Sequence, residues 1–455
     1  MKLFIVLLTG AFMLATGTSD VFAKKKEKVQ TEAKSDTVQT VSKKRNTQYP
    51  RLFKNKRVVT KKGLITIHKI NDKLYFEFPK SLLGRDFLMG SSVSATSNNT
   101  SGLVGQTMTT PLHIRFAIQE DQIYMQNVTP VSRMDVYSNQ SDISRAVAKS
   151  NIAPNMESFK IAAYNMDSTA VVFEVTKFFL ADNKRLPLFD QNSASLEDEK
   201  YGKLELKAIL KKNLSSIRNF YVFDDNLEIN LDMSFYQSLL ANKREVRGGN
   251  VRVKAVYSML LLPEEVMTWR LGDPRLGYTY TKKQKISTEK DGTAFSYLQH
   301  KWNLLPTDKE AYRRGDLVAP RKPVLFYIDS DFPEAWKKAI KEGVNWWNEA
   351  FKMAGFKDAV QTADFPANDT TFYAGNLKYS CIRYVPVNLS KTQSKVWVDP
   401  RSGEIINGTI FVGHDIAKTI ASQRFVQTAQ VDERMRGIQL SEEALLEGIR
   451  LYVAR

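Results

Sequence analysis

The chain has 455 residues, which is long enough for two or three domains that each bury a core. With 43% apolar and 25% charged residues, its composition is typical of globular proteins and excludes a chain that is disordered throughout. The net charge of +17 is concentrated near the start: residues 24–62 hold fourteen Lys or Arg against three acids, a net of +11, and the remainder carries only +6.

Residues 1–23 have the pattern of a signal peptide. Lys2 is followed by an apolar run from Leu3 to Ala15, and Val21-Phe22-Ala23 places small residues where a signal peptidase cleaves. The apolar run is too short for a membrane span, which needs about 20 residues. We therefore predict export to the periplasm, the cell surface or the extracellular space, with a mature chain that begins near Lys24.

Residues 24–48 are rich in Lys, Gln, Thr and Ser and nearly free of aromatic residues, which predicts a basic disordered linker. Such a segment can contact nucleic acid or anionic membranes, or it can simply be a solvated spacer. We expect no nucleic-acid partner, and we leave an association with the cell envelope through this segment open.

Residues 49–305 read as one or more β-rich modules. Two alternating runs are separated by Asn71-Asp72, which predicts a tight hairpin turn. Further short strands with turn signals between them indicate sheet structure rather than helices. The strands that we expect lie at 64–70, 73–78, 113–119, 122–127, 158–163, 170–179 and 251–262.

A proline-rich and charged segment, 304–323, predicts a domain junction, after which residues 323–455 form a second domain. The continuous apolar run at 323–329 predicts a buried strand. Apolar residues spaced by three and four then place one face of a long helix in the core: Trp336, Ile340, Val344, Trp347, Phe351 and Ala354. The single cysteine, Cys381, excludes an internal disulfide, and its apolar neighbours predict a buried strand residue rather than a reactive thiol.

The last sixty residues contain the most distinctive motifs of the sequence. Asp399-Pro400-Arg401-Ser402-Gly403 predicts a turn between a strand at 396–398 and a returning strand at 405–412. Ser441 is the expected N-cap of a final helix, with Glu442 and Glu443 in its first turn. The chain stops while this helix is still running, and we expect that the protein is truncated.

At three segments the sequence resembles a family of secreted bacterial zinc-dependent metalloproteases. The matching segments are residues 399–405, residues 425–432 and the final helix that follows Ser441. The resemblance implies an α+β fold in which β-rich N-terminal modules of unknown function are followed by the N-terminal half of a metzincin-like α/β zinc-peptidase domain, residues 323–455. It also implies a peptide or protein substrate.

In that family the closing helix leads into His-Glu-x-x-His, whose histidines bind zinc and whose glutamate is the general base. In our alignment Arg455 falls on the position of the first zinc histidine, so none of the family's zinc ligands lies in these 455 residues. Zinc is the cofactor that the resemblance implies for the full-length protein. We expect this chain alone neither to bind zinc nor to cleave peptides.

The resemblance also suggests where a peptide substrate would bind. In the resembled fold an edge strand pairs with the extended substrate, and the candidate is the run Gly408, Thr409, Ile410, Phe411 and Val412. The alternative is an interior strand without substrate contact. His414 and Asp415 follow this run, either as groups close to the substrate or as a surface pair at the end of a strand.

No other catalytic arrangement is indicated. The four histidines, His68, His113, His300 and His414, are far apart in the sequence and form no His-x₃-His pair, whereas a zinc site needs three or four close ligands. There is no Gly-x-Ser-x-Gly elbow and no Gly-rich phosphate loop. The alternatives to an exported metalloendopeptidase are a pseudopeptidase and a β-rich surface protein for adhesion or glycan binding.

Overall fold

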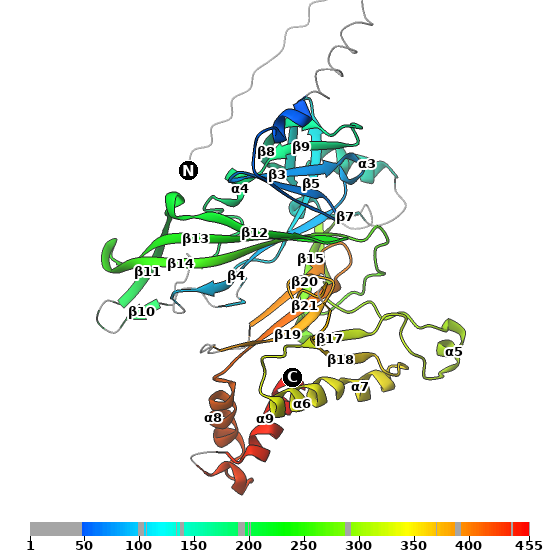
Figure 1. The fold of residues 1–455 in the computed structure, drawn as a ribbon. Coiled ribbons are helices and arrows are strands. Elements are labelled where there is room, and N and C mark those ends of the chain that lie inside the picture. The colour runs from blue at the N-terminus through cyan, green and yellow to red at the C-terminus, as the bar shows by residue number, and fades with distance from the viewer. Residues whose placement is uncertain are drawn as a thin grey trace, which may run out of the picture. The chain divides into compact units, whose positions relative to one another are not determined.

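The computed structural model describes residues 48–98, 104–105, 107–132, 134–136, 141–189, 196–198, 200, 202–286, 293–369, 371–386, 393–437 and 440–454 (Figure 1). The predicted signal peptide, the predicted linker up to residue 47, and Arg455 lie outside the described residues. Within those ranges no helix has both the length and the apolar character that crossing a bilayer demands.

Most of the chain from Val58 to Leu261 forms one 13-stranded sheet in which every pairing is antiparallel. The predicted hairpin is confirmed, since Ile70 pairs with Lys73 and Asn71 has a φ of 55°. In spatial order the strands are β1 (Val58–Lys62), β2 (Thr66–Ile70), β3 (Lys73–Pro79), β9 (Ala170–Glu174), β8 (Asn155–Tyr164), β6 (Gln122–Asn127), β5 (Leu112–Gln119), β4 (Phe87–Thr96), β14 (Arg244–Leu261), β13 (Asn226–Ala241), β11 (Gly202–Leu210) and β10 (Leu196–Asp198), and β12 (Ser216–Val222) also pairs with β13.

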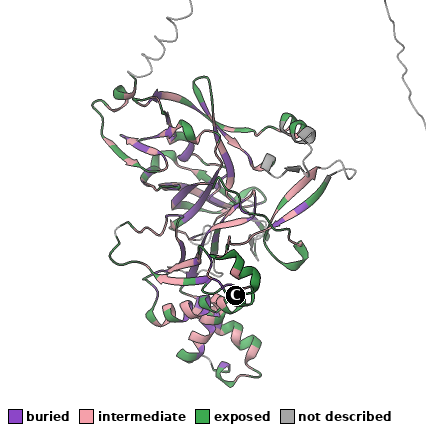
Figure 2. Ribbon diagram, turned by 90° about the vertical axis from the view of Figure 1, so that its right-hand side faces the viewer, coloured by how far each residue is buried: buried purple, intermediate pink, exposed green. Residues whose placement is uncertain are grey.

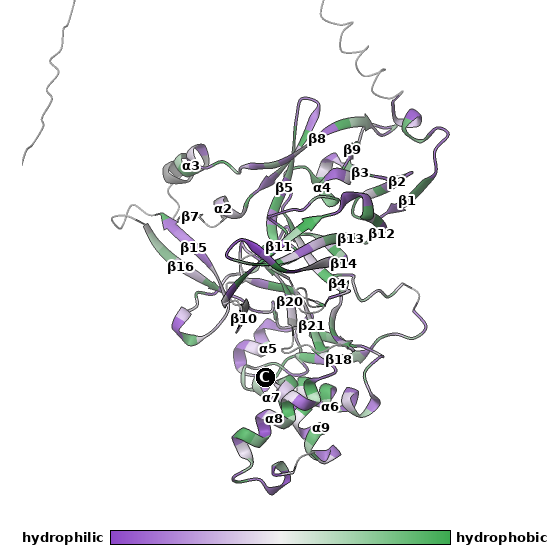
Figure 3. Ribbon diagram, turned by 90° about the vertical axis from the view of Figure 1, so that its left-hand side faces the viewer, coloured by the Kyte–Doolittle hydropathy of each residue, from purple (hydrophilic) through white to green (hydrophobic). Residues whose placement is uncertain are grey.

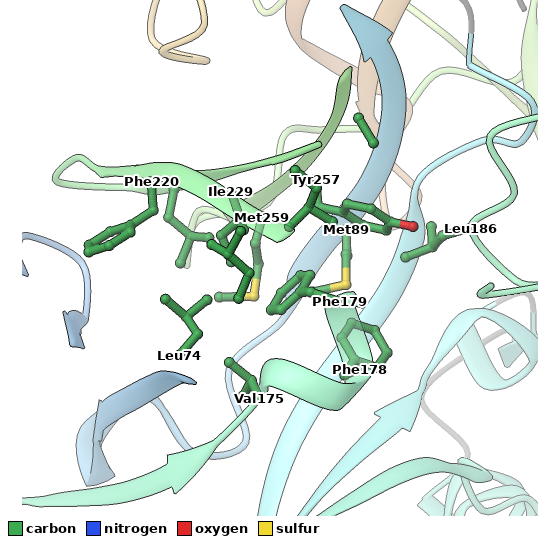
Figure 4. Packing of buried hydrophobic residues seen from close by; sticks show 14 of the residues in the cluster. Leu74, Met89, Val175, Phe178, Phe179, Leu186, Phe220, Ile229, Tyr257 and Met259 are labelled. Atoms are coloured by element: carbon green, nitrogen blue, oxygen red, sulfur yellow. The ribbon is translucent and has the colours of Figure 1, made fainter. Parts of the chain in front are cut away.

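The largest core cluster of this sheet is rich in phenylalanine. Along β13, buried and partly exposed residues alternate from Ile229 to Gln237, as expected where one face of a sheet is covered, whereas the residues from Asn226 to Ile229 are all buried. Phe178 and Phe179 of the short helix α4 (Thr176–Phe179) insert between residues of several strands, among them Met89 and Tyr257 (Figure 4). The buried residues follow the strands of this sheet in Figure 2.

Short elements connect these strands. The helices between them are η1 (Lys80–Leu82), α2 (Thr129–Ser132), α3 (Ser141–Ser150) and η2 (Lys212–Leu214), whereas η3 (Pro274–Leu276) and α5 (Lys309–Arg314) follow the last strand of this sheet. A small sheet places β15 (Tyr280–Ile286) between β16 (Thr293–Gln299) and β7 (Met134–Val136).

The C-terminal part contains a five-stranded mixed sheet, in the order β18 (Val360–Asp364), β17 (Val324–Ile328), β19 (Ser380–Val385), β21 (Glu404–Gly413) and β20 (Gln393–Asp399). The helices near it are α6 (Glu334–Asn345), α7 (Trp347–Met353), α8 (Ile416–Thr428), η4 (Glu433–Met435) and α9 (Glu442–Ala454). Ile340, Ile420 and Ile449 of α6, α8 and α9 share a core with strand residues such as Ile382, and the apolar stretches of these helices are visible in Figure 3.

The long helix that we predicted from Trp336 to Ala354 is divided at Trp346 into α6 and α7. Ile340 and Val344 are buried as expected, but Trp347 is 47% exposed. The predicted N-cap of the last helix is confirmed, because the Ser441 hydroxyl accepts a hydrogen bond from the Ala444 amide at 3.2 Å.

The predicted turn between β20 and β21 is also confirmed, and it explains why residue 403 is glycine. Gly403 has a φ of 81°, and a Cβ at this position would lie 2.5 Å from the carbonyl oxygen of Gln299. A side chain here would therefore be strained by its own backbone and would also clash with a neighbouring strand.

The predicted fold class is wrong. The structure is β-rich, with large antiparallel sheets and few helices, and residues 323–455 form no clear α/β peptidase half. Residues 323–455 share a core with the large sheet, because Trp397 of β20 is fully buried in one cluster with Leu88 and Leu260. The order of strands and helices along the sequence did not reveal this shared core, since it depends on contacts between distant segments.

Candidate functional site: a buried lysine between two sheets

The predicted substrate-binding run, Gly408 to Val412, lies in the interior of the mixed sheet and not at its edge. One side of β21 pairs in parallel with β19, where Cys381 faces Thr409, and the other pairs antiparallel with β20, where Lys395 faces Thr409. Its backbone groups are thus already engaged on both sides, so the prediction of an edge strand is wrong. An added peptide strand would need free N–H and C=O groups.

The side chains of the same run point to different surroundings, because successive residues of a strand face opposite sides of the sheet. Ile410 and Val412 pack on the helical side, in the core with Ile382. Thr409 and Phe411 line a cavity of about 440 Å³ on the other side. We name it the Lys395 cavity. Its wall comes from β4, β13 and β14 of the large sheet, from the loop 373–377, and from β19, β20 and β21.

Lys395 is the most unusual residue of this cavity. It is only 8% exposed, its Nζ donates a hydrogen bond to Ser92 Oγ at 3.2 Å, and Nζ lies 5.1 Å from the centroid of the Trp397 ring. Burial lowers the pKa of Lys395 to about 8, against the opposing attraction of Glu228. At neutral pH the side chain therefore remains mostly charged, but at a considerable desolvation cost.

Glu228 supplies the negative charge of the cavity and is 5% exposed. Its Oε1 accepts a hydrogen bond from the Tyr373 hydroxyl at 2.5 Å and another from Asn230 Nδ2 at 2.8 Å. Burial, together with the neighbouring Glu228, raises the pKa of Tyr373, so this hydroxyl stays a donor at physiological pH. The backbone of Gly375 approaches the carboxylate so closely that a Cβ there would collide with Oε2.

Arg383 is the second cation that lines the cavity. Its guanidinium carbon lies 5.7 Å from the centroid of the Phe411 ring, a cation–π distance. With Lys395 and Arg383 positive and Glu228 negative, the charged side chains of the lining sum to +1.

The structure places the four histidines in separate surroundings. His68 contacts Glu77 and Thr60, His113 lies 3.0 Å from Asp86, and His300 contacts Thr281. His414 is exposed at the end of β21 and shares a hydrogen bond of 2.5 Å with the hydroxyl of Tyr384, which itself lines the cavity.

In the ranges given above, no group of three or more His, Cys, Asp or Glu is arranged to hold a metal ion. Arg455, the position that we aligned with a zinc histidine, lies outside the described residues.

Lys395, Glu228, Tyr373 and Ser92 were not predicted from the sequence. One signal for Lys395 was available: in β20, Lys395, Trp397 and Asp399 alternate with more exposed residues, and all three are buried. A lysine in the register of a buried tryptophan indicates an inward-facing charge. Ser92 could not have been found this way, because it lies 303 residues from Lys395 in the sequence.

Comparison with known proteins identifies two domains. Residues 47–96 match a domain of unknown function, DUF5118, and residues 105–307 match a second one, DUF5117. No curated protein and no solved structure matches the sequence. The chain thus carries two domains of unknown function, and the Lys395 cavity lies where β4 of the first and β13 and β14 of the second meet strands outside both.

Proposed function

We propose that this chain is part of an exported zinc-dependent metalloendopeptidase, and that it contributes structure and substrate contacts rather than the zinc ligands. The support comes from the sequence segments that resemble such proteases, namely 399–405, 425–432 and the closing helix. Zinc hydrolases need three protein ligands around the metal, and the histidines described above do not fit this requirement. No catalytic step is therefore assigned to residues of this chain.

One structural observation carries the proposal: segment 399–405, one of those that resemble the family, forms a buried junction. Asp399 is fully buried and accepts hydrogen bonds from Arg401, whose guanidinium also donates to the carbonyl of Pro263 at 2.7 Å. Arg401 further lies 3.4 Å from Asp86, at the start of β4. This part of the resemblance therefore lies in residues that join the large sheet to the C-terminal sheet.

The test compares the 455-residue chain with the product of its full reading frame. We expect the longer product to hold about one zinc per chain and to cleave casein in a chelator-sensitive way, because the His-Glu-x-x-His helix would complete the site. The 455-residue chain should do neither. A longer product that folds without zinc would be a pseudopeptidase, and a reading frame that closes at Arg455 would overturn the proposal and favour a surface protein for adhesion or glycan binding.

Export is the second part of the proposal. The signal-like segment 1–23 should be removed after Ala23, so the N-terminal sequence of the protein recovered from the cell envelope or the medium should begin at Lys24. Replacing Ala23 with a bulky residue such as Phe should block this cleavage. Recovery of the intact N-terminus in the cytoplasmic fraction would contradict export.

A further inference from the structure

The Lys395 ammonium is buried with little compensation from the protein. A lysine ammonium has three N–H donors, and among the described residues Ser92 Oγ is the hydrogen-bond partner that the structure gives it. The ring of Trp397 adds a weaker attraction. A charged group in such surroundings is stabilised mainly when an anion with acceptor oxygens lies beside it.

Glu228, the acidic residue that lines the cavity, does not fully balance the charge of Lys395. Oε1 of Glu228 already accepts hydrogen bonds from Tyr373 and Asn230, and these two bonds stabilise its negative charge. No carboxylate among the described residues forms an ion pair with Arg383. The cavity thus holds two cations against one compensated anion, an arrangement that favours an anionic ligand.

The shape and lining limit what such a ligand can be. A volume of about 440 Å³ lies within the range of small-molecule pockets. Hydroxyl groups of Ser92, Ser258 and Thr409 offer further hydrogen bonds, and Phe411 offers an apolar surface. We propose that the Lys395 cavity binds a carboxylate, either a small organic acid or the carboxyl end of a short peptide, with Lys395 and Arg383 as its cationic partners.

This binding site does not depend on the peptidase proposal. The cavity is formed by residues of the 455-residue chain alone, and carboxylate binding needs no zinc. A chain that binds carboxylates but gives no zinc-containing longer product would support this inference and overturn the other.

Calorimetric titration of the purified 455-residue chain at pH 7 tests the inference with three probes: acetyl-dialanine, its C-terminal amide, and propionate. We expect the free acid to bind at least about tenfold more tightly than the amide, because the amide lacks the charge that Lys395 and Arg383 recognise. Propionate binding as tightly as the peptide acid identifies a small acid as the ligand. A clear preference for the peptide acid identifies a peptide end.

The variant Lys395→Met keeps the unbranched shape of the side chain and most of its length but removes its charge, and it should weaken acetyl-dialanine binding at least about tenfold. Lys418→Met changes an exposed lysine of α8 and should leave binding unchanged. Binding by the unmodified chain should also weaken by about tenfold per pH unit above pH 8, as Lys395 loses its proton. Equal binding of acid and amide, full binding by Lys395→Met, or no binding of any probe at about 10 mM would overturn the inference.

Discussion

Replacing Asp86 with alanine is expected to lower the free energy of unfolding by about 3–5 kcal/mol, the usual effect of removing one partner from a buried ion pair. The Asp86 side chain is 11% exposed and lies between three cationic or ionisable groups. Arg115 Nε is 2.5 Å and His113 Nε2 is 3.0 Å from its Oδ1, and Arg401 Nη1 is 3.4 Å from its Oδ2. Without the carboxylate, the buried His113 would lose its acidic partner and Arg401, whose side chain is 21% exposed, would keep a poorly balanced charge, whereas Arg115, at 42% exposed, can still be hydrated.

A matched control is available on the surface. Asp273 pairs with Arg275 in an exposed turn, where the arginine side chain is 86% exposed. Asp273→Ala should leave the free energy of unfolding nearly unchanged, because an exposed pair is screened by water. Urea unfolding followed by tryptophan fluorescence measures both variants, and equal losses for the two would contradict the importance of the Asp86 junction.

The Asp86 contribution should also depend on pH. Burial alone would raise the pKa of Asp86, but hydrogen bonds from His113 and Arg115 outweigh it and hold that pKa well below its usual range. A carboxyl whose pKa is depressed by folding adds stability above its unfolded pKa of about 4, and this stability is lost as the pH falls below that value. The difference between the unmodified chain and Asp86→Asn should therefore shrink below pH 4.

The features that sequence patterns predicted are those fixed by neighbouring residues. The hairpin at Asn71, the turn at Gly403 and the N-cap at Ser441 each depend on the conformational preference of one or two residues. Cys381 is fully buried, and burial raises the pKa of its thiol to about 12, so it is the inert core residue that its apolar neighbours indicated.

The features that the patterns missed depend on long-range pairing. The run from Gly408 to Val412 is an interior strand because β19 and β20 pair with β21 on either side. The alternation of side chains along β21 does not indicate which strands lie beside it. The junction between Asp86 and Arg401 spans 315 residues. Such contacts form only once the sheets have packed, and the candidate site, which lies between two sheets, shares this property.

The variant Lys395→Met should be more stable than the unmodified chain at pH 7, by about 3 kcal/mol. Burial lowers the pKa of Lys395 from its ordinary value of 10.5 to about 8, and lowering a pKa by one pH unit corresponds to about 1.4 kcal/mol. Below pH 8 the lysine is charged in both the folded and the unfolded state, so folding bears the full cost of burying the charge. Between pH 8 and 10.5 the folded state has released the proton and the unfolded state still holds it, and the cost disappears.

The stability of the unmodified chain should therefore rise relative to Lys395→Met as the pH increases from 8 to 10.5, and the two should nearly coincide at the upper limit. Urea unfolding of ligand-free protein across this range measures the difference, with Lys418→Met as the exposed control that should remain within about 0.5 kcal/mol throughout. A difference that does not change with pH, or a loss of stability at pH 7, would mean that Glu228 compensates the ammonium within the fold. In that case the protein would gain nothing from an external carboxylate. A variant that is more stable but no longer binds carboxylates would instead show that the charge of Lys395 lowers the stability of the fold and is required for ligand binding.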